Sequence, residues 1–235
     1  MNWLKQTLWS SIGKKLMMAV TGLAFCAFLT GHLAGNLTIY GGKEALNSYA
    51  AQLRSLGPLI TAMELGLFLF AVIHIITGLT LFYQNTMARG GRYAVSKKAV
   101  RRSLVSKRAD VRSFFTNGGG RTIGSATMPY TGVLLLLFVV IHLINFTFVD
   151  KSQTTLANIV AQTFENPLWV AFYVLAMIVA AVHVSHGFWS AFQTIGANHK
   201  KYMRLIMIFS TIFSLIVGFG FGLLPIFVSL AGLKG

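Results

Sequence analysis

Five long apolar stretches alternate with polar segments along this chain. They lie near residues 12–36, 59–83, 129–149, 167–192 and 203–231. Each is about long enough for a helix to cross a hydrocarbon core of roughly 30 Å, and a helix satisfies its own backbone hydrogen bonds in lipid. The pattern predicts an all-α membrane protein with five transmembrane helices, organised as one domain over 1–235. The first stretch is too long for the apolar region of a signal peptide, so we expect a retained helix.

The composition agrees with this class, and the placement of charge predicts an orientation. Hydrophobic residues make up 55% of the chain and charged residues only 11%, against roughly 25% in soluble domains. The net charge is +15, and with the N-terminus inside most Lys and Arg residues fall on the inner side, as the positive-inside rule predicts. We therefore expect the N-terminus inside, a basic inner loop over 84–128 and no nucleic-acid partner. This loop also offers a docking surface to an acidic partner.

A weak internal duplication relates the first and third stretches, and the second and fourth. The segments "TGLAFCAFLTGHL" and "TGVLLLLFVVIHL" align His32 with His142. The segments "AVIHIITGL" and "AAVHVSHGF" align His74 with His183, and both pairs are separated by nearly the same number of residues. Two matches with a common separation indicate a repeat more strongly than one match would.

Small residues flank the second pair of histidines at helical spacing. An Ala lies three positions before each histidine and a Gly four positions after it, namely Ala71, Gly78, Ala180 and Gly187. These positions share a helix face with the histidine, one turn away on either side. The resulting hollow suits a flat ligand held edge-on, or else close packing of another helix.

The histidines are expected at two depths in the membrane. His74 and His183 follow Pro58 and Pro167, which open their helices at the outer side, so both lie about 24 Å along their helices and in the inner half. His32 and His142 lie on helices that run the other way, and both fall in the outer half. Each level therefore combines one histidine from each half of the duplication.

Two imidazoles at one level favour haem ligation over other metal sites. A zinc site needs about four converging ligands, whereas a six-coordinate haem takes one axial nitrogen from each side. The chain has no C-x-x-C-H motif, so two haems would be b-type and bound non-covalently. The alternative is that the histidines only form hydrogen bonds between helices.

Several stretches together resemble a known family. They are "GKKLMMAVTGLAFCAFLTGHLAGNL", "HIITGL", "TMPYTGVLLLLFVVIHL" and "HVSHGFWSAF". The chain resembles the di-haem cytochrome b membrane-anchor subunit of succinate dehydrogenases and fumarate reductases, the type with a single five-helix anchor. The resemblance implies that the first four helices bind haem. It also implies that His32 and His142 are axial ligands of an outer haem b, and His74 and His183 of an inner one.

The resemblance also implies partners and a location. A flavoprotein subunit with FAD and an iron–sulfur subunit would dock on the inner face of the cytoplasmic membrane of a prokaryote. Electrons would pass through the inner and then the outer haem to a membrane quinone, for which menaquinone is the usual species in this family. The reaction would be succinate oxidation or fumarate reduction, and the resemblance is compatible with a homo-oligomer of the complex.

Two further residues have candidate roles, and a third bears on the type of enzyme. His186 lies one turn from His183 and is expected to contact a haem propionate or backbone. Glu64 lies near the start of the second helix, where it is either a proton relay for the quinone or an interfacial carboxylate favoured by the helix N-terminus. Ala181 occupies a position where some related fumarate reductases carry a carboxylate of a transmembrane proton path. This difference favours an enzyme without that path.

Two other classes of protein remain as alternatives. The chain could be the cytochrome b subunit of another membrane oxidoreductase, such as a hydrogenase or a nitrate reductase, which its partner on purification would reveal. It could instead be a transporter with the two halves as parallel repeats. A colourless purified protein would favour the transporter.

Overall fold

The computed structural model describes residues 2–87, 116–117 and 121–233, and this part of the chain is almost entirely helical. The helices are α1 (Asn2–Trp9), α2 (Ser11–Asn36), the 3-10 helix η1 (Leu37–Gly41), α3 (Lys43–Ser55), α4 (Pro58–Met87), α6 (Ile123–Phe146), α7 (Leu156–Glu165), α8 (Pro167–Thr194) and α9 (Lys200–Ala231). Two short antiparallel strands precede α6, namely β1 (Thr116–Asn117) and β2 (Arg121–Thr122). Most of the predicted basic loop lies outside the described residues.

Five helices are long and apolar enough to cross a membrane: α2 with η1, α4, α6, α8 and α9. Large apolar side chains are exposed along them, for example Phe68 (68%), Leu137 (56%) and Phe219 (64%). A hydrocarbon environment explains this exposure, because such surfaces are rare on soluble monomers. The prediction of five apolar helices in a multi-pass membrane protein is therefore confirmed.

The third long helix begins and ends earlier than the predicted stretch near 129–149, and its candidate membrane span is Thr127–Phe146. Helix α6 begins at Ile123, so Pro129 lies inside the helix and does not open it. The helix ends at Phe146, because the amides of Thr147 and Phe148 both donate to the carbonyl of Leu143, at 2.8 and 2.9 Å, and close the last turn. By contrast, Pro58 and Pro167 do begin α4 and α8 as predicted.

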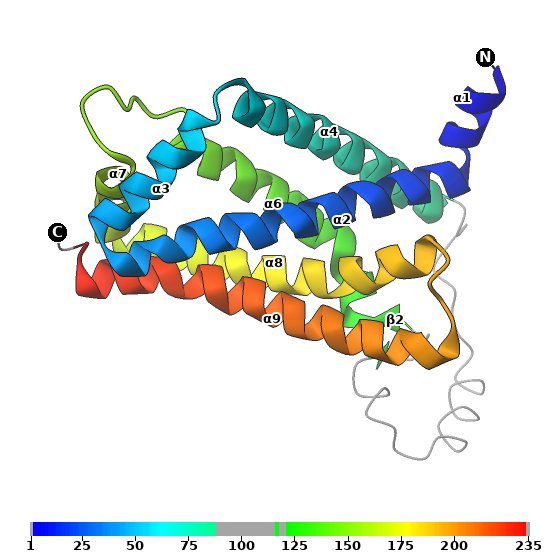
Figure 1. The fold of residues 1–235 in the computed structure, drawn as a ribbon. Coiled ribbons are helices and arrows are strands. Elements are labelled where there is room, and N and C mark those ends of the chain that lie inside the picture. The colour runs from blue at the N-terminus through cyan, green and yellow to red at the C-terminus, as the bar shows by residue number, and fades with distance from the viewer. Residues whose placement is uncertain (1, 88–115, 118–120, 234–235) are drawn as a thin grey trace.

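The two halves of the chain have the same order of elements, a long helix, a short helix and a long helix. Helices α2, α3 and α4 form the first half, and α6, α7 and α8 form the second. The short helices α3 and α7 pack together at one end of the bundle (Figure 1). The side-chain oxygen of Asn47 in α3 accepts a hydrogen bond of 3.1 Å from the amide of Ala157 in α7.

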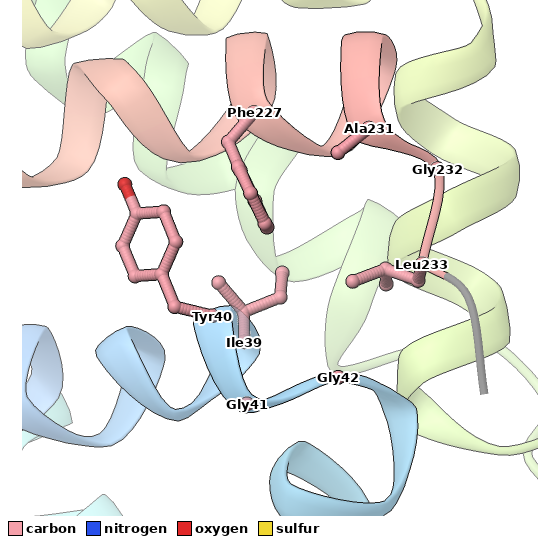
Figure 2. Close-up of a pocket in the computed structure, with 8 residues that line it drawn as sticks. All are labelled: Ile39, Tyr40, Gly41, Gly42, Phe227, Ala231, Gly232 and Leu233. Carbon is pink, nitrogen blue, oxygen red and sulfur yellow. The ribbon is translucent and has the colours of Figure 1, made fainter.

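The end that carries α3 and α7 is called the far end below, and the opposite end is called the basic end. At the basic end α2 and α9 begin and α4 and α8 end (Figure 1). Lys14, Lys15, Lys201 and Arg204 belong to it. At the far end, a hollow of about 340 Å³ lies between the η1 segment and the end of α9. Figure 2 shows Tyr40 beside Phe227 at this hollow, with the Tyr40 hydroxyl directed away from Gly42 and Leu233.

Helix α9 packs closely on α8 and α2 through its glycines. A Cβ atom at Gly218 would lie 2.9 Å from the Cβ of Ala181, and one at Gly220 would lie 2.8 Å from Leu33. Small residues allow such close approach of membrane helices. The buried hydroxyl of Ser210 in α9 donates a 2.6 Å hydrogen bond to the carbonyl of Ser185 in α8. The fifth long helix therefore closes the bundle.

Candidate functional site

Four long helices each contribute one of the predicted histidines to the interior of the bundle. Helix α2 packs against α4 and α8, and α6 packs against the same two helices. Helices α2 and α6 are therefore diagonal to each other, and so are α4 and α8. A side chain directed to the bundle axis meets its diagonal partner there.

The structure brings the histidines together in the pairs expected from their depths. His32 of α2 and His142 of α6 face each other, with ring centroids 5.9 Å apart and planes at 89°. His74 of α4 and His183 of α8 lie within electrostatic reach of each other. The first two are called the far-end pair below, and the second two are called the basic-end pair.

A buried threonine orients His74 in the basic-end pair. The Thr21 Oγ1 lies 3.0 Å from the Nδ1 of His74, and the same hydroxyl donates to the carbonyl of Met17 at 2.8 Å. When the hydroxyl proton is directed to a carbonyl, the Thr21 oxygen is placed to accept a hydrogen bond from the imidazole tautomer that carries its proton on Nδ1. The Nε2 of His74 then keeps its lone pair, which is the arrangement found in metal-ligating histidines.

The second half of the chain repeats this arrangement. The Thr131 Oγ1 lies 3.0 Å from the Nδ1 of His183 and donates to the carbonyls of Thr127 and Met128, each at 3.1 Å. Only 3% of Thr21 and 8% of Thr131 is exposed, so water does not compete for these bonds. In the tautomer with the proton on Nδ1, each imidazole of the basic-end pair keeps the Nε2 lone pair as an acceptor.

The glycine after each threonine leaves room for the imidazole of the basic-end pair. A Cβ atom at Gly22 would lie 3.4 Å from the Cε1 of His74, and one at Gly132 would lie 3.5 Å from the Cε1 of His183. A methyl group would just touch the ring, and a larger side chain would press on it. The repeated Thr-Gly dipeptide was visible in the sequence, but the contact of the threonine with the histidine was missed.

Methionine side chains lie beside the glycines that follow the basic-end histidines. The Met18 methyl lies 3.7 Å from the Cβ position of Gly78, and the Met128 methyl lies 3.9 Å from that of Gly187. Methionine is unbranched and adapts its shape readily. The hollow predicted beside each histidine is therefore bordered by a side chain that can move aside for a flat group.

Aromatic rings surround the far-end pair. Phe28 stacks on His32, with centroids 5.1 Å apart and planes at 17°. Phe138, Phe146 and Tyr173 lie 5.6, 5.3 and 6.1 Å from His142. Among the described residues, the buried Nδ1 of His142 has no hydrogen-bond partner. The side-chain nitrogen of Asn36 lies 3.5 Å from the Nε2 of His32, at the outer limit for a hydrogen bond.

The two pairs are the histidines that would hold a metal in a macrocycle, and the far-end pair allows a test of the distance. A metal–imidazole bond is about 2 Å long, so the ring centres of two ligands on opposite sides of one ion are roughly 6 Å apart. The far-end centroids, 5.9 Å apart, are close to this separation, and no described residue bonds the buried Nδ1 of His142. In the basic-end pair, the threonine bonds leave both Nε2 atoms free for a metal.

The remaining predicted residues, His186 and Glu64, belong to neither pair, and His186 lies close enough to His183 to interact with it electrostatically. His186 lies one turn beyond His183 towards the basic end, and its ring packs edge-on against Trp189 at 5.0 Å. Glu64 is exposed near the far end of α4. Partial burial and the nearby charge of Arg54 lower the pKa of Lys151, and the charge of Glu64 opposes this. Glu64 therefore lies in a small group of charges with Arg54 and Lys151.

Packing against α9 explains the small side chain of Ala181. It lies against Gly218 of α9, where a Cβ atom would approach the Ala181 methyl to 2.9 Å. A carboxylate side chain at this position would separate α8 from α9.

Comparison with known proteins adds no further information on the site. No protein-family model, curated protein or solved structure matches this chain.

Proposed function

We propose that this chain is the di-haem cytochrome b membrane anchor of a succinate:quinone oxidoreductase. It would carry electrons between an iron–sulfur subunit and a membrane quinone. The observation that carries the proposal is the basic-end pair, in which a buried threonine from each half of the repeat lies at hydrogen-bond distance from the Nδ1 of one imidazole. Histidines that serve only packing do not need the same threonine contact in both halves of the repeat.

The proposed roles of the residues follow from their contacts. A bound haem b supplies a one-electron carrier. Thr21 and Thr131 would hold the ring orientation of His74 and His183, so that Nε2 of each ring is available as a ligand. His32 and His142 would supply the second pair of ligands inside a layer of aromatic rings that excludes water. The two levels are about 16 Å apart, because Thr21 and His32 are separated by about three turns of α2.

The orientation proposed for the chain follows from its charge. With the basic end inside a prokaryotic cytoplasmic membrane, the flavoprotein and iron–sulfur subunits would dock there, next to the level of His74 and His183. The level of His32 and His142 would then face the outer side, where a quinone such as menaquinone would react.

Glu64 is the proposed proton relay of the quinone reaction. It is exposed at the far end, in the group of charges that also contains Arg54 and Lys151. We expect Glu64→Gln to lower quinone-coupled turnover of the intact complex by on the order of 100-fold, with both haems retained. Glu44→Gln, in α3 at the same end, is the matched control. Equal turnover in both variants would contradict the role of Glu64.

The haem content of the purified full-length chain tests the proposed function. The pyridine haemochrome spectrum should give about two b-type haems per polypeptide. His199→Ala, which removes a histidine outside both pairs, should leave this value unchanged. A well-folded chain without haem would contradict the electron-transfer function. A haem-containing chain that copurifies with subunits of another class would place it in a different oxidoreductase.

A further inference from the structure

The positive charge of Lys14 lacks an anion among the described residues. Lys14 lies in the first turn of α2, and only 4% of its surface is exposed. Its ammonium group donates a hydrogen bond of 2.8 Å to the Oε1 of Gln84, in the last turn of α4. That amide is neutral. An ammonium group has three donors, and buried charges in proteins are normally paired with an opposite charge.

The acidic residues of the chain are placed elsewhere. The chain has five of them, and Glu44, Glu64, Asp150 and Glu165 belong to the far end. Asp110 lies outside the described residues. In the part of the chain that the structure describes, no carboxylate is therefore available to Lys14 at the basic end.

Lys14 faces the same seam between helices as His74. It precedes Thr21 by two turns of α2, so the two residues share a helix face, and Thr21 binds the imidazole of His74. Gln84 follows His74 along α4 towards the basic end. The neighbouring Lys15 is exposed, as expected for a lysine that extends to the membrane surface. The burial of Lys14 therefore reflects this particular seam.

We propose that Lys14 is the counter-ion of a haem propionate at the basic-end pair. This inference rests on the proposed function, because it requires a haem held by His74 and His183. Haem b carries two carboxylates at one edge, and an ammonium group with two unused donors is suited to one of them. The assignment fixes an orientation, with the carboxylate edge of that haem directed to the basic end, the side on which Lys14 and Gln84 lie.

Redox titration of both haems in the full-length membrane-bound chain tests this role. A nearby positive charge opposes a positive charge on iron, so Lys14→Met should lower the midpoint potential of one haem. The affected haem should be the one that is lost in His74→Ala, and the other haem should keep its potential as an internal control for folding. Lys14→Arg should retain most of the wild-type potential. Lys15→Met is the matched control and should change neither haem.

The possible failures of the inference and of the proposed function can be distinguished. If two haems are bound and Lys14→Met titrates like Lys15→Met, Lys14 is not a counter-ion, and haem ligation still stands. If Lys14→Met no longer lowers a haem midpoint potential in a chain that also carries Asp110→Asn, the anion is Asp110 and the assignment to a propionate is wrong. A wild-type chain without haem would overturn both the inference and the proposed function.

Discussion

The two histidine pairs come from one repeated pattern and lie in one bundle, but their surroundings differ. In the basic-end pair the Nδ1 of each imidazole lies 3.0 Å from the hydroxyl oxygen of a buried threonine. In the far-end pair the rings are enclosed by phenylalanines and a tyrosine, and the Nδ1 of His142 has no hydrogen-bond partner. Hydrogen bonds orient the first pair, whereas ring packing orients the second. Perturbing a hydroxyl or a ring should therefore affect one pair and spare the other.

The largest effect that separates the pairs is expected from enlarging the glycine beside a basic-end imidazole. A leucine at Gly22 would extend beyond the Cβ position that already lies 3.4 Å from the Cε1 of His74. We expect Gly22→Leu to lose most of the basic-end haem, at a cost in stability of about 1–3 kcal/mol from overpacking. Pyridine haemochrome analysis measures the loss. Gly31→Leu on the same helix, where a Cβ meets nothing within 4 Å, should keep both haems.

An intermediate effect is expected from removing a threonine hydroxyl. Thr21→Val keeps the shape of the side chain but loses the acceptor for the Nδ1–H of His74. Loss of a partner that orients a ligand typically weakens metal affinity by about 10–100-fold, and Thr131→Val should act in the same way. Haem retention against a competing haem-binding protein measures the change. Thr30→Val, which removes an exposed hydroxyl bonded only to the carbonyl of Cys26, is the control. A loss of far-end haem in Thr21→Val would refute the separation of the pairs.

The smallest effect is expected at the far end. Phe28→Leu removes the ring that stacks on His32. Such stacking contributes about 0.5–1.5 kcal/mol beyond the area it buries, so far-end haem should dissociate a few-fold faster. Phe25→Leu is the reciprocal variant, because Phe25 packs edge-on against His74 at 5.6 Å, and it should affect the basic-end haem alone. Stopped-flow haem transfer resolves the two rates.

Hydropathy predicted the long helices well, because each one has to fill the thickness of a membrane with apolar residues. It did not predict α3 or α7, since neither is long enough to span a membrane. The extent of α6 also differed, since the helix begins at Ile123 and the predicted stretch began near 129. In each of these cases the hydropathy of the segment says little about the helix, whose bounds depend on packing against the rest of the bundle.

The candidate site was predictable only in part. The repeat and the prolines indicated which histidines share a level, and the structure brings the same residues together. The bonds from Thr21 and Thr131 depend on how α2 approaches α4 and how α6 approaches α8, which a single sequence does not give. The burial of Lys14 likewise depends on the tertiary structure, because the adjacent Lys15 is exposed. Buried polar contacts between helices are thus the features that sequence reasoning missed.

The central claim is that diagonal helices supply two ligand pairs, and single and double histidine variants test it most directly. Optical and low-temperature EPR spectra of His32→Ala, His74→Ala, His142→Ala and His183→Ala should fall into two classes. Each class should lack the same haem, and the double variant His74→Ala/His183→Ala should lose no more than either single variant. Any other grouping of the four variants would contradict the pairing, for example loss of the same haem in His32→Ala and His74→Ala.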